Sequence, residues 1–323
     1  MNGPLDPRQL EAFSAVVATG GVTAAAQMLG RSQPAVTRQI QELETTLGFS
    51  LLERTGRGVT PTERGRRFHI EVERHLAGLQ RLSDRAGAIL AGAGASLEIA
   101  AIPAFAAGLI SEAVAHMPAA GDIAVHLRAV GGEEVVDLVL DRISDLGLCS
   151  LPLRSAGLDV HWAVEADCVA VLRTDDPLAR EKIVPLQALA GRRLITTANP
   201  YRQRRHVDEA LRAAGLSRQT PLDTNTSFSA IGAVRAGLGV ALIEPLTPAG
   251  APVEGLVTRA IDVSLPFRYG AIMRAGSPPS QLIQELIGAL PGFLGERVPG
   301  LRKIEIARDE LVAEDSPPLE ASA

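Results

Sequence analysis

The chain has 323 residues, of which 46% are hydrophobic and 21% are charged, and its formal net charge is −5 at pH 7. This length and composition predict two or three globular domains and exclude a disordered chain, and the acidic balance excludes a histone-like protein while allowing a local cationic face. The two cysteines, Cys149 and Cys168, exclude a disulfide framework, and we expect reduced core thiols more than a redox switch.

The sequence predicts a cytoplasmic protein with no membrane partner. It has no run of about 18 uncharged apolar residues. Its N-terminus also lacks the basic, then apolar, then small-residue order of a signal peptide.

Three short helices are predicted in the first 48 residues. Residues 7–17 carry apolar side chains at helical spacing, and a glycine pair ends that helix. Thr23 stands at the N-cap or in the first turn of a second helix over residues 24–29. After a turn, Pro34 lies in the first turn of a third helix, which Gly48 ends.

Two short helices around a tight turn are typical of a helix-turn-helix, whose second helix enters the major groove with its N-terminal residues at base edges. Gln33 can bond adenine bidentately, and Arg38 can reach guanine or phosphate. The predicted groove-facing residues are Thr23, Ser32, Gln33, Pro34, Thr37 and Arg38. Spacing alone fits equally well an ordinary three-helix bundle with these side chains in solvent.

Residues 51–62 contain two short extended pieces around a glycine-flanked arginine, which predicts a β-hairpin wing. Arg54 and Arg57 flank its tip, where they could neutralise phosphates or enter the minor groove. Thr60 and Thr62 could add phosphate contacts. The sequence therefore predicts a second DNA-contacting element.

Residues 63–90 carry apolar side chains at steps of three and four, which predicts one long helix with a face for a partner helix. The glycine- and alanine-rich segment 91–96 predicts a linker and a domain boundary.

Short strands and helices alternate beyond the linker, which predicts parallel α/β architecture in two lobes. The predicted strands cover residues 97–102, 123–130, 146–149, 168–172, 193–197, 222–224 and 240–243. The predicted helices cover residues 105–116, 131–141, 203–214 and 228–236. Beyond residue 300 the chain is rich in acidic residues, and its last dozen residues are expected to be disordered.

Several ordered motifs resemble the LysR-type transcriptional regulators over residues 5 to 295. In the N-terminal region they are Leu10-Glu-Ala-Phe13, Gly21-Val-Thr-Ala-Ala-Ala26, Ser32-Gln-Pro-Ala-Val-Thr-Arg-Gln-Ile40, Leu43-Glu44, Leu47-Gly48, Leu51-Leu-Glu-Arg54 and Thr60-Pro-Thr62. Further along they are Leu97-Glu-Ile-Ala-Ala-Ile-Pro103, Asp145-Leu-Gly-Leu148 and Val234-Arg-Ala-Gly-Leu-Gly-Val240. This likeness favours DNA binding over the plain helical bundle.

The resemblance implies an α/β protein with a winged helix-turn-helix, a dimerising linker helix and a two-lobed, periplasmic-binding-protein-like effector domain. The corresponding ranges are 1–65, 66–91 and 92–300, with lobe I at 97–166 and 269–295, lobe II at 167–268, and a tail at 301–323. The implied partners are double-stranded promoter DNA, a small-molecule inducer, further copies of the chain as dimer or tetramer, and RNA polymerase. No enzyme activity, cofactor or metal is expected.

Within that family, the segments Tyr201-Arg202-Gln203, Glu244-Pro-Leu-Thr247 and Val263-Ser-Leu-Pro-Phe267 look most like the lysine-biosynthesis and opine-catabolism regulators. This implies an amino-acid-derived inducer such as diaminopimelate or an opine. The residues carried over to the effector cleft are Pro103, Ala104, Phe105, Ser150, Thr196, Tyr201, Arg202, Thr226 and Ser227. Arg202 could hold a carboxylate bidentately, whereas Ala104 departs from the Ser or Thr that many members have there.

Three alternatives stay open at this point. An enzyme is disfavoured because the sequence has no Gly-x-Ser-x-Gly elbow, no phosphate-loop pattern and no histidines at metal-ligand spacing. A transport-type solute-binding protein would share the two-lobed fold, but it would need a signal peptide and would not need residues 5–65. The third alternative is a regulator that binds DNA but no small-molecule inducer.

Overall fold

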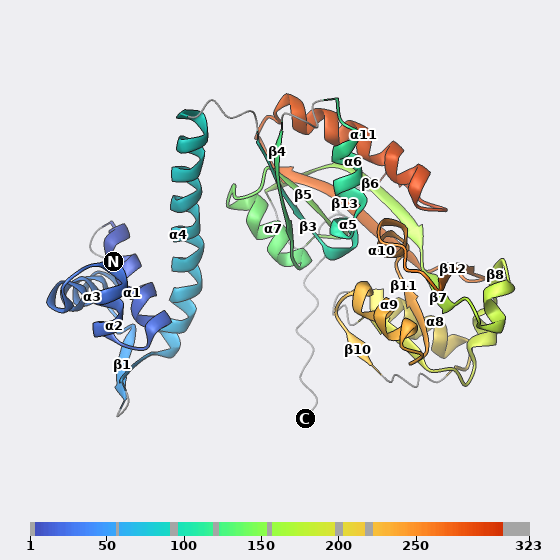
Figure 1. The fold of residues 1–323 in the computed structure, drawn as a ribbon, viewed down its shortest axis with the longest axis horizontal. Helices are drawn as coiled ribbons and strands as arrows, with labels where there is room; N and C mark the ends of the chain where they lie inside the picture. The colour runs from blue at the N-terminus through green and yellow to red at the C-terminus, as the bar shows by residue number, and fades with distance from the viewer. Residues whose placement is uncertain are drawn as a thin grey trace. The chain divides into compact units, whose positions relative to one another are not determined.

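A computed structural model describes residues 4–55, 58–90, 96–118, 123–153, 157–197, 203–216 and 222–305. The chain divides into two compact units, Met1–Ala93 and Gly94–Ala323, and each is described by itself (Figure 1). Tyr201, Arg202 and Arg57 lie outside the described residues.

Within residues 4–55 and 58–90, the first unit contains four helices and one hairpin. Its elements are α1 (Pro7–Thr19), α2 (Val22–Leu29), α3 (Gln33–Leu47), β1 (Leu52–Thr55), β2 (Gly58–Pro61) and α4 (Glu63–Leu90). The Asp6 carboxylate caps α1 by accepting the N–H of Arg8 at 2.8 Å, and Gly48 ends α3 in a left-handed conformation with φ 76°. The predicted three helices, the wing and the long helix are all present.

Apolar side chains from α1, α2 and α3 form one core cluster of this unit, and side chains from α1, α3 and α4 form another. Phe13 and Leu43 are fully buried, and Val72 of α4 joins them in the same cluster. Further along α4, Leu79, Leu82 and Leu90 are 38%, 67% and 90% exposed. The first half of the long helix therefore packs on the helix-turn-helix, and leucines on its second half face solvent.

The second unit contains two six-stranded sheets, which the chain visits in turn. One sheet has the order β14-β6-β13-β5-β3-β4 and the other the order β10-β9-β11-β7-β12-β8. The first sheet comprises β3 (Ser96–Ala101), β4 (Ala124–Ala129), β5 (Leu146–Ser150), β6 (Leu158–Asp167), β13 (Pro266–Arg274) and β14 (Arg302–Ile304). The second comprises β7 (Val169–Arg173), β8 (Ile183–Val184), β9 (Leu194–Thr197), β10 (Asp223–Thr224), β11 (Val240–Ile243) and β12 (Leu256–Ile261).

The prediction of parallel architecture is correct only in part, because both sheets are mixed. Strands β3, β4 and β5 run parallel, but β13 pairs antiparallel with β5 and β6. In the other sheet β9, β10 and β11 are parallel, and β7 pairs antiparallel with β11 and β12. Strands β6 and β13 were not predicted, and they carry the chain between the two sheets.

The helices of this unit are α5 (Pro103–Ala106), α6 (Leu109–Ala115), α7 (Gly132–Leu140), α8 (Gln203–Ala213), α9 (Ser227–Arg235), α10 (Leu246–Gly250) and α11 (Gln281–Arg297), with short 3-10 turns at Pro177–Arg180 and Leu186–Leu189. The single helix predicted over residues 105–116 is broken into α5 and α6 at Gly108, which has φ 118°. A Cβ at Gly108 would lie 2.1 Å from the carbonyl oxygen of Gly250. The break therefore brings two backbone segments into direct contact.

The folded region extends past residue 300, where the sequence placed the start of a tail. β14 pairs antiparallel with β6, with Arg302 opposite Glu165. The buried Glu165 carboxylate accepts hydrogen bonds from Arg302 at 2.5 Å and from Arg268 at 2.7 Å. Two arginines from different strands therefore neutralise one buried carboxylate at the edge of the sheet. Residues 306–323 lie outside the described residues.

Both cysteines are buried core residues without a disulfide. Burial raises the pKa of the Cys149 thiol to about 12, and burial with the nearby carboxylates of Glu244 and Asp167 raises the pKa of Cys168 further. Neither thiol is therefore ionised near neutral pH, which argues against a redox role. Among the helices described, none is long and apolar enough to span a bilayer.

Candidate DNA interface and effector site

The start of α3 presents most of the predicted base-reading residues to solvent. Ser32, Gln33 and Pro34 are exposed at its N-terminus, and the Arg38 side chain one turn later is 80% exposed. Thr37 is half-buried, and its hydroxyl donates to the carbonyl oxygen of Gln33 at 3.0 Å.

The α2–α3 turn is held by Arg31, which the sequence analysis did not single out. Its guanidinium bonds the Glu11 carboxylate at 2.6 Å and the carbonyl oxygen of Arg8 at 3.2 Å, both on α1. Thr23 lies exposed in the first turn of α2, and Gly21 rather than Thr23 is the N-cap. Arg31 therefore stabilises the turn between α2 and α3. In the sequence, only its position in that turn indicated this structural role.

The wing is an antiparallel hairpin in which Arg54 pairs with Val59 and Thr60 pairs with Glu53. Strand β2 is bonded to the end of α1, because the N–H of Val59 donates to the carbonyl oxygen of Gly20 at 3.3 Å. Thr60 is exposed and remains a predicted phosphate contact. The structure describes neither Arg57 nor the side chain of Arg54, so their predicted roles stay predictions.

Thr62 has a structural role that the sequence reading missed. Its hydroxyl donates to the carbonyl oxygen of Ser50 at 2.9 Å and accepts the N–H of Gly65 at 2.9 Å. A hydroxyl has one hydrogen to donate, and a phosphate needs a donor. Thr62 therefore caps the start of α4, and its phosphate contact, which would need the hydroxyl hydrogen that the Ser50 carbonyl takes here, stays a prediction.

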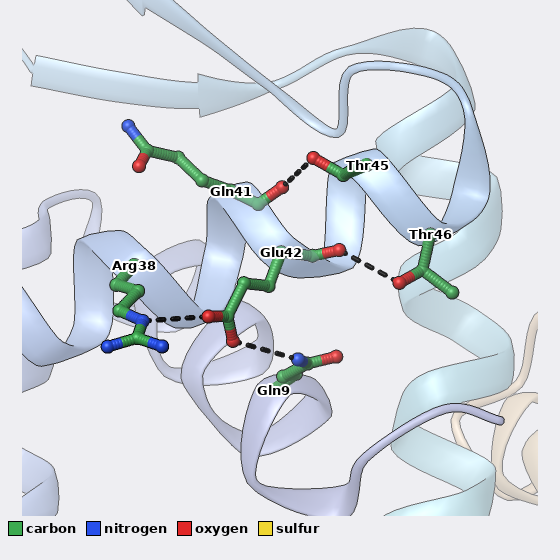
Figure 2. A pocket seen from close by; sticks show the side chains of 6 residues that line it. All are labelled: Gln9, Arg38, Gln41, Glu42, Thr45 and Thr46. Carbon is green, nitrogen blue, oxygen red and sulfur yellow. Dashed lines mark hydrogen bonds and ion pairs between the residues drawn. The ribbon is translucent and has the colours of Figure 1, made fainter. Parts of the chain in front are cut away.

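A shallow hollow lies beside the exposed face of α3 (Figure 2). Its lining residues are Gln9 from α1 and Arg38, Gln41, Glu42, Thr45 and Thr46 from α3. The Nε of Arg38 donates to Oε1 of Glu42 at 2.7 Å, and the side-chain amide of Gln9 donates to Oε2 of Glu42 at 3.3 Å. The sequence reading had not included Gln9 or Glu42 in this surface.

The predicted effector-site residues that the structure describes lie on α5, β5 and β9 and at the start of α9. The short helix α5, which follows β3, contacts both α9 and α10. These contacts form a junction between the two sheets, because α5 follows a strand of one sheet and α9 and α10 flank strands of the other. Ser150 ends β5, next to β3, and is half-buried, whereas Thr196 on β9 is buried. Figure 1 shows α5 and α10 at this junction.

The start of α9 is organised by two hydroxyls. Thr226 caps the helix by accepting the N–H of Ser229 at 3.2 Å, and it bonds the Ser229 hydroxyl at 2.9 Å. Ser227 is buried and hydrogen-bonds the carboxylate of Glu244. The N-terminus of a helix carries partial positive charge, which favours an anion such as a carboxylate.

Glu244 is a buried residue of the junction whose role the sequence reading missed. Its carboxylate accepts the N–H of Leu246 at 2.6 Å, the N–H of Thr247 at 3.0 Å and the hydroxyl of Thr247. The Glu244 carboxylate thereby caps the start of α10. Burial raises the pKa of Glu244, and these hydrogen bonds oppose that effect. The signal was an acid just after a buried strand and two residues before a helix.

Phe105 differs from its predicted place. Its side chain has no exposed surface, and its ring lies 5.5 Å from Tyr269 and 6.5 Å from Trp162, centroid to centroid. The ring therefore belongs to the core beneath α5, while Pro103 is partly exposed and Ala104 is buried. Of the predicted cleft residues, Tyr201 and Arg202 lie outside the described residues.

Two family models match the chain in sequence. Residues 7–66 match the "Bacterial regulatory helix-turn-helix protein, lysR family" model, and residues 91–294 match the "LysR substrate binding domain" model. Together they span both compact units.

Curated relatives align over nearly the whole chain. Regulatory protein NocR of Agrobacterium fabrum is 30% identical over 290 residues, covering 88% of this chain and 96% of the relative. Transcriptional activator protein LysR of Escherichia coli is 29% identical over 301 residues, covering 92% and 96%. The octopine catabolism/uptake operon regulatory protein OccR of Rhizobium meliloti is 27% identical over 286 residues, covering 88% and 95%.

Solved structures share the fold. The crystal structure of CbnR, a LysR family transcriptional regulator, matches with a TM-score of 0.71 at 22% identity and covers 89% of this chain and 99% of that one. Full-length CbnR in complex with its target DNA matches equally well. The helix-turn-helix model matches the first unit and the substrate-binding model matches the second, and the chain belongs to the LysR family of DNA-binding transcriptional regulators with an effector-binding domain.

Proposed function

We propose that this regulator reads its operator mainly through the N-terminal turn of α3. In this proposal Gln33 and Arg38 contact base edges, and the wing contacts the phosphate backbone of the DNA. The observation that supports this most is the exposure of Ser32, Gln33, Pro34 and Arg38 on one helix that Arg31 and Glu44 fix in place. Side chains held on a rigid element suit direct readout of bases.

The substitution Gln33→Ala, measured on two duplexes, tests the proposed readout. The probe is a duplex enriched from a random-sequence library by the wild-type chain, compared with unselected duplex of equal length. Gln33→Ala should weaken binding to the enriched duplex by about 1 to 3 kcal/mol and leave unselected duplex nearly unchanged. Equal losses on both duplexes would show that Gln33 does not read bases.

We further propose that the effector is an amino-acid-derived molecule whose carboxylate lies near the start of α9. The partial positive charge at the N-terminus of α9 supports a carboxylate there, and the relative OccR is named for octopine catabolism. Opines and diaminopimelate carry the required carboxylate and amino groups. Arg202 stays a predicted carboxylate ligand.

A melting-temperature screen of the full chain tests this ligand class. A ligand that binds the native state raises its melting temperature. Opines, diaminopimelate, lysine and simple organic acids are the compounds to compare, and a hit should lose its shift with Ser227→Ala. A shift only with other organic acids would replace the amino-acid class, and no shift with any compound would favour ligand-independent regulation.

The proposed assembly is a dimer joined through α4, with pairs of dimers forming a tetramer. The exposed leucines 79, 82 and 90 on the second half of α4 support this, because apolar side chains on a long helix favour a partner helix. Two recognition helices would then face half-sites about one helical turn apart, roughly 34 Å. Contact with RNA polymerase and a cytoplasmic location complete the proposal.

A further inference from the structure

The exposed face of α3 carries a carboxylate where an anionic partner is expected to approach. Glu42 lies one turn after Arg38 on this face, and its side chain is 44% exposed. DNA carries dense negative charge, so an unpaired carboxylate here would weaken binding to every sequence. A role for Glu42 must therefore come from its contacts with neighbouring side chains.

Both carboxylate oxygens of Glu42 have partners, and the partners come from two helices (Figure 2). Oε1 accepts Nε of Arg38 at 2.7 Å, and Oε2 accepts Nε2 of Gln9 on α1 at 3.3 Å. The hydrogen bond from Arg38 lowers the pKa of Glu42, so the carboxylate stays ionised. Gln9 and Arg38 thus hold a fixed carboxylate between α1 and α3.

The same contact orients Arg38. Because Nε is bonded to Glu42, the two terminal nitrogens of the guanidinium remain for other acceptors, and the part of the chain that the structure describes offers them no hydrogen-bond partner. Thr45 and Thr46 do not compete for Glu42, since their hydroxyls donate to backbone oxygens of Gln41 and Glu42 itself. Exposed ion pairs four residues apart on a helix add little to stability.

We propose that Glu42, held by Gln9, is a positioning residue that fixes the Arg38 guanidinium for a base edge and so determines DNA sequence specificity. The inference rests on the proposed readout by α3. A long arginine without this contact can turn to the nearest phosphate, which carries no sequence information. The negative charge of the carboxylate lowers affinity for both kinds of DNA alike, and specificity is the difference between the two affinities, so only the positioning of Arg38 changes the ratio.

The test compares dissociation constants of the full-length chain for the enriched duplex and for unselected duplex across a salt series. Glu42→Gln should tighten binding to unselected duplex, because one negative charge is lost. The specificity ratio should fall about tenfold, in the range of one bidentate base contact. Gln9→Ala changes no charge and should lower the ratio a few-fold without tightening unselected binding. Melting temperatures check that both variants fold.

Two controls separate positioning from charge. Glu53→Gln removes an exposed carboxylate on the wing and should leave the ratio unchanged. In an Arg38→Ala background, Glu42→Gln should have no effect on the ratio, since the group that it positions is gone. A new selection with Glu42→Gln should lose the base preference at one position per half-site.

Each outcome is decisive. If Glu42→Gln tightens both duplexes equally, Glu42 acts only as a charge and the inference is overturned. The same holds if the effect of Glu42→Gln survives in the Arg38→Ala background. If Arg38→Ala and Gln33→Ala leave the ratio at its wild-type value, the readout by α3 itself is wrong, and that result is distinct from a failure of Glu42 alone.

Discussion

The Glu44 carboxylate at the end of α3 accepts the backbone N–H of Leu51 at 2.6 Å, and the same oxygen accepts the N–H of Leu52 at 3.1 Å. The recognition helix is thereby tied to the first residues of the wing. Glu44→Ala should lower the unfolding free energy of the DNA-binding unit by about 1 to 2 kcal/mol, because it leaves backbone donors unpaired. Denaturant unfolding of the full chain, monitored by the circular dichroism of its helices, measures this loss.

Glu53→Ala is the matched control for Glu44→Ala, since it removes an exposed carboxylate from the neighbouring strand. It should change stability by less than about 0.5 kcal/mol. Similar losses in the two variants would mean that the contacts of Glu44 with the backbone add nothing.

A second prediction concerns glycines on α4. A Cβ at Gly65 would lie 2.0 Å from the carbonyl oxygen of Leu51, whereas Gly87 on the same helix has open space around it. Gly65→Ala should destabilise the unit by roughly 2 kcal/mol or more, because the helix start must move away from the wing. Gly87→Ala should stabilise it by about 0.4 to 1 kcal/mol. Thermal melts of both variants measure the two changes in stability. A Gly65→Ala variant as stable as the wild type would count against the close packing of Gly65 on Leu51.

A third prediction concerns self-association. Leu82 on α4 is 67% exposed, and the adjacent Ser83 is also exposed. Leu82→Glu should weaken dimer formation by a factor of roughly ten or more, since burial of a leucine is lost and a charge is added at the interface. Ser83→Glu should leave the oligomeric state unchanged. Sedimentation velocity over a concentration series measures both, and an intact dimer with Leu82→Glu would place the interface elsewhere.

A fourth prediction follows from the two buried thiols. With the pKa of Cys149 raised to about 12 and that of Cys168 raised further, both stay protonated between pH 7 and 9 in the folded protein. We expect no alkylation of either thiol by iodoacetamide under native conditions and full alkylation of both in denaturant. Mass spectrometry of the labelled chain gives the count. Rapid native labelling that rises between pH 7 and 9 would reinstate a reactive cysteine.

Local signals predicted the DNA-binding unit well. Pro34 and Gly48 lie at the start and end of α3, and the apolar spacing from Phe68 onward gave α4 its full length. These signals act within a few residues, so they are visible in one sequence. The role of Thr62 was missed because its partner, the carbonyl oxygen of Ser50, lies across the wing.

The effector domain was harder to predict because its strands pair over long distances. Nothing local in residues 158–167 shows that this strand pairs antiparallel with residues 266–274. Glu165 reads as a surface acid until Arg268 and Arg302 are brought to it. The break at Gly108 likewise depends on Gly250, which is far along the chain.

β14 has a consequence for how the protein behaves when it is shortened. It covers the outer edge of β6, and a strand edge without a neighbour is a template on which another chain can add a strand. A protein ending at residue 300 would expose the backbone groups of β6 and leave Glu165 with Arg268 alone. If that shortened protein aggregates, the cause is the exposed edge of β6 and not damage to the effector site. A chain ending at Glu305 keeps β14 and therefore keeps this edge covered.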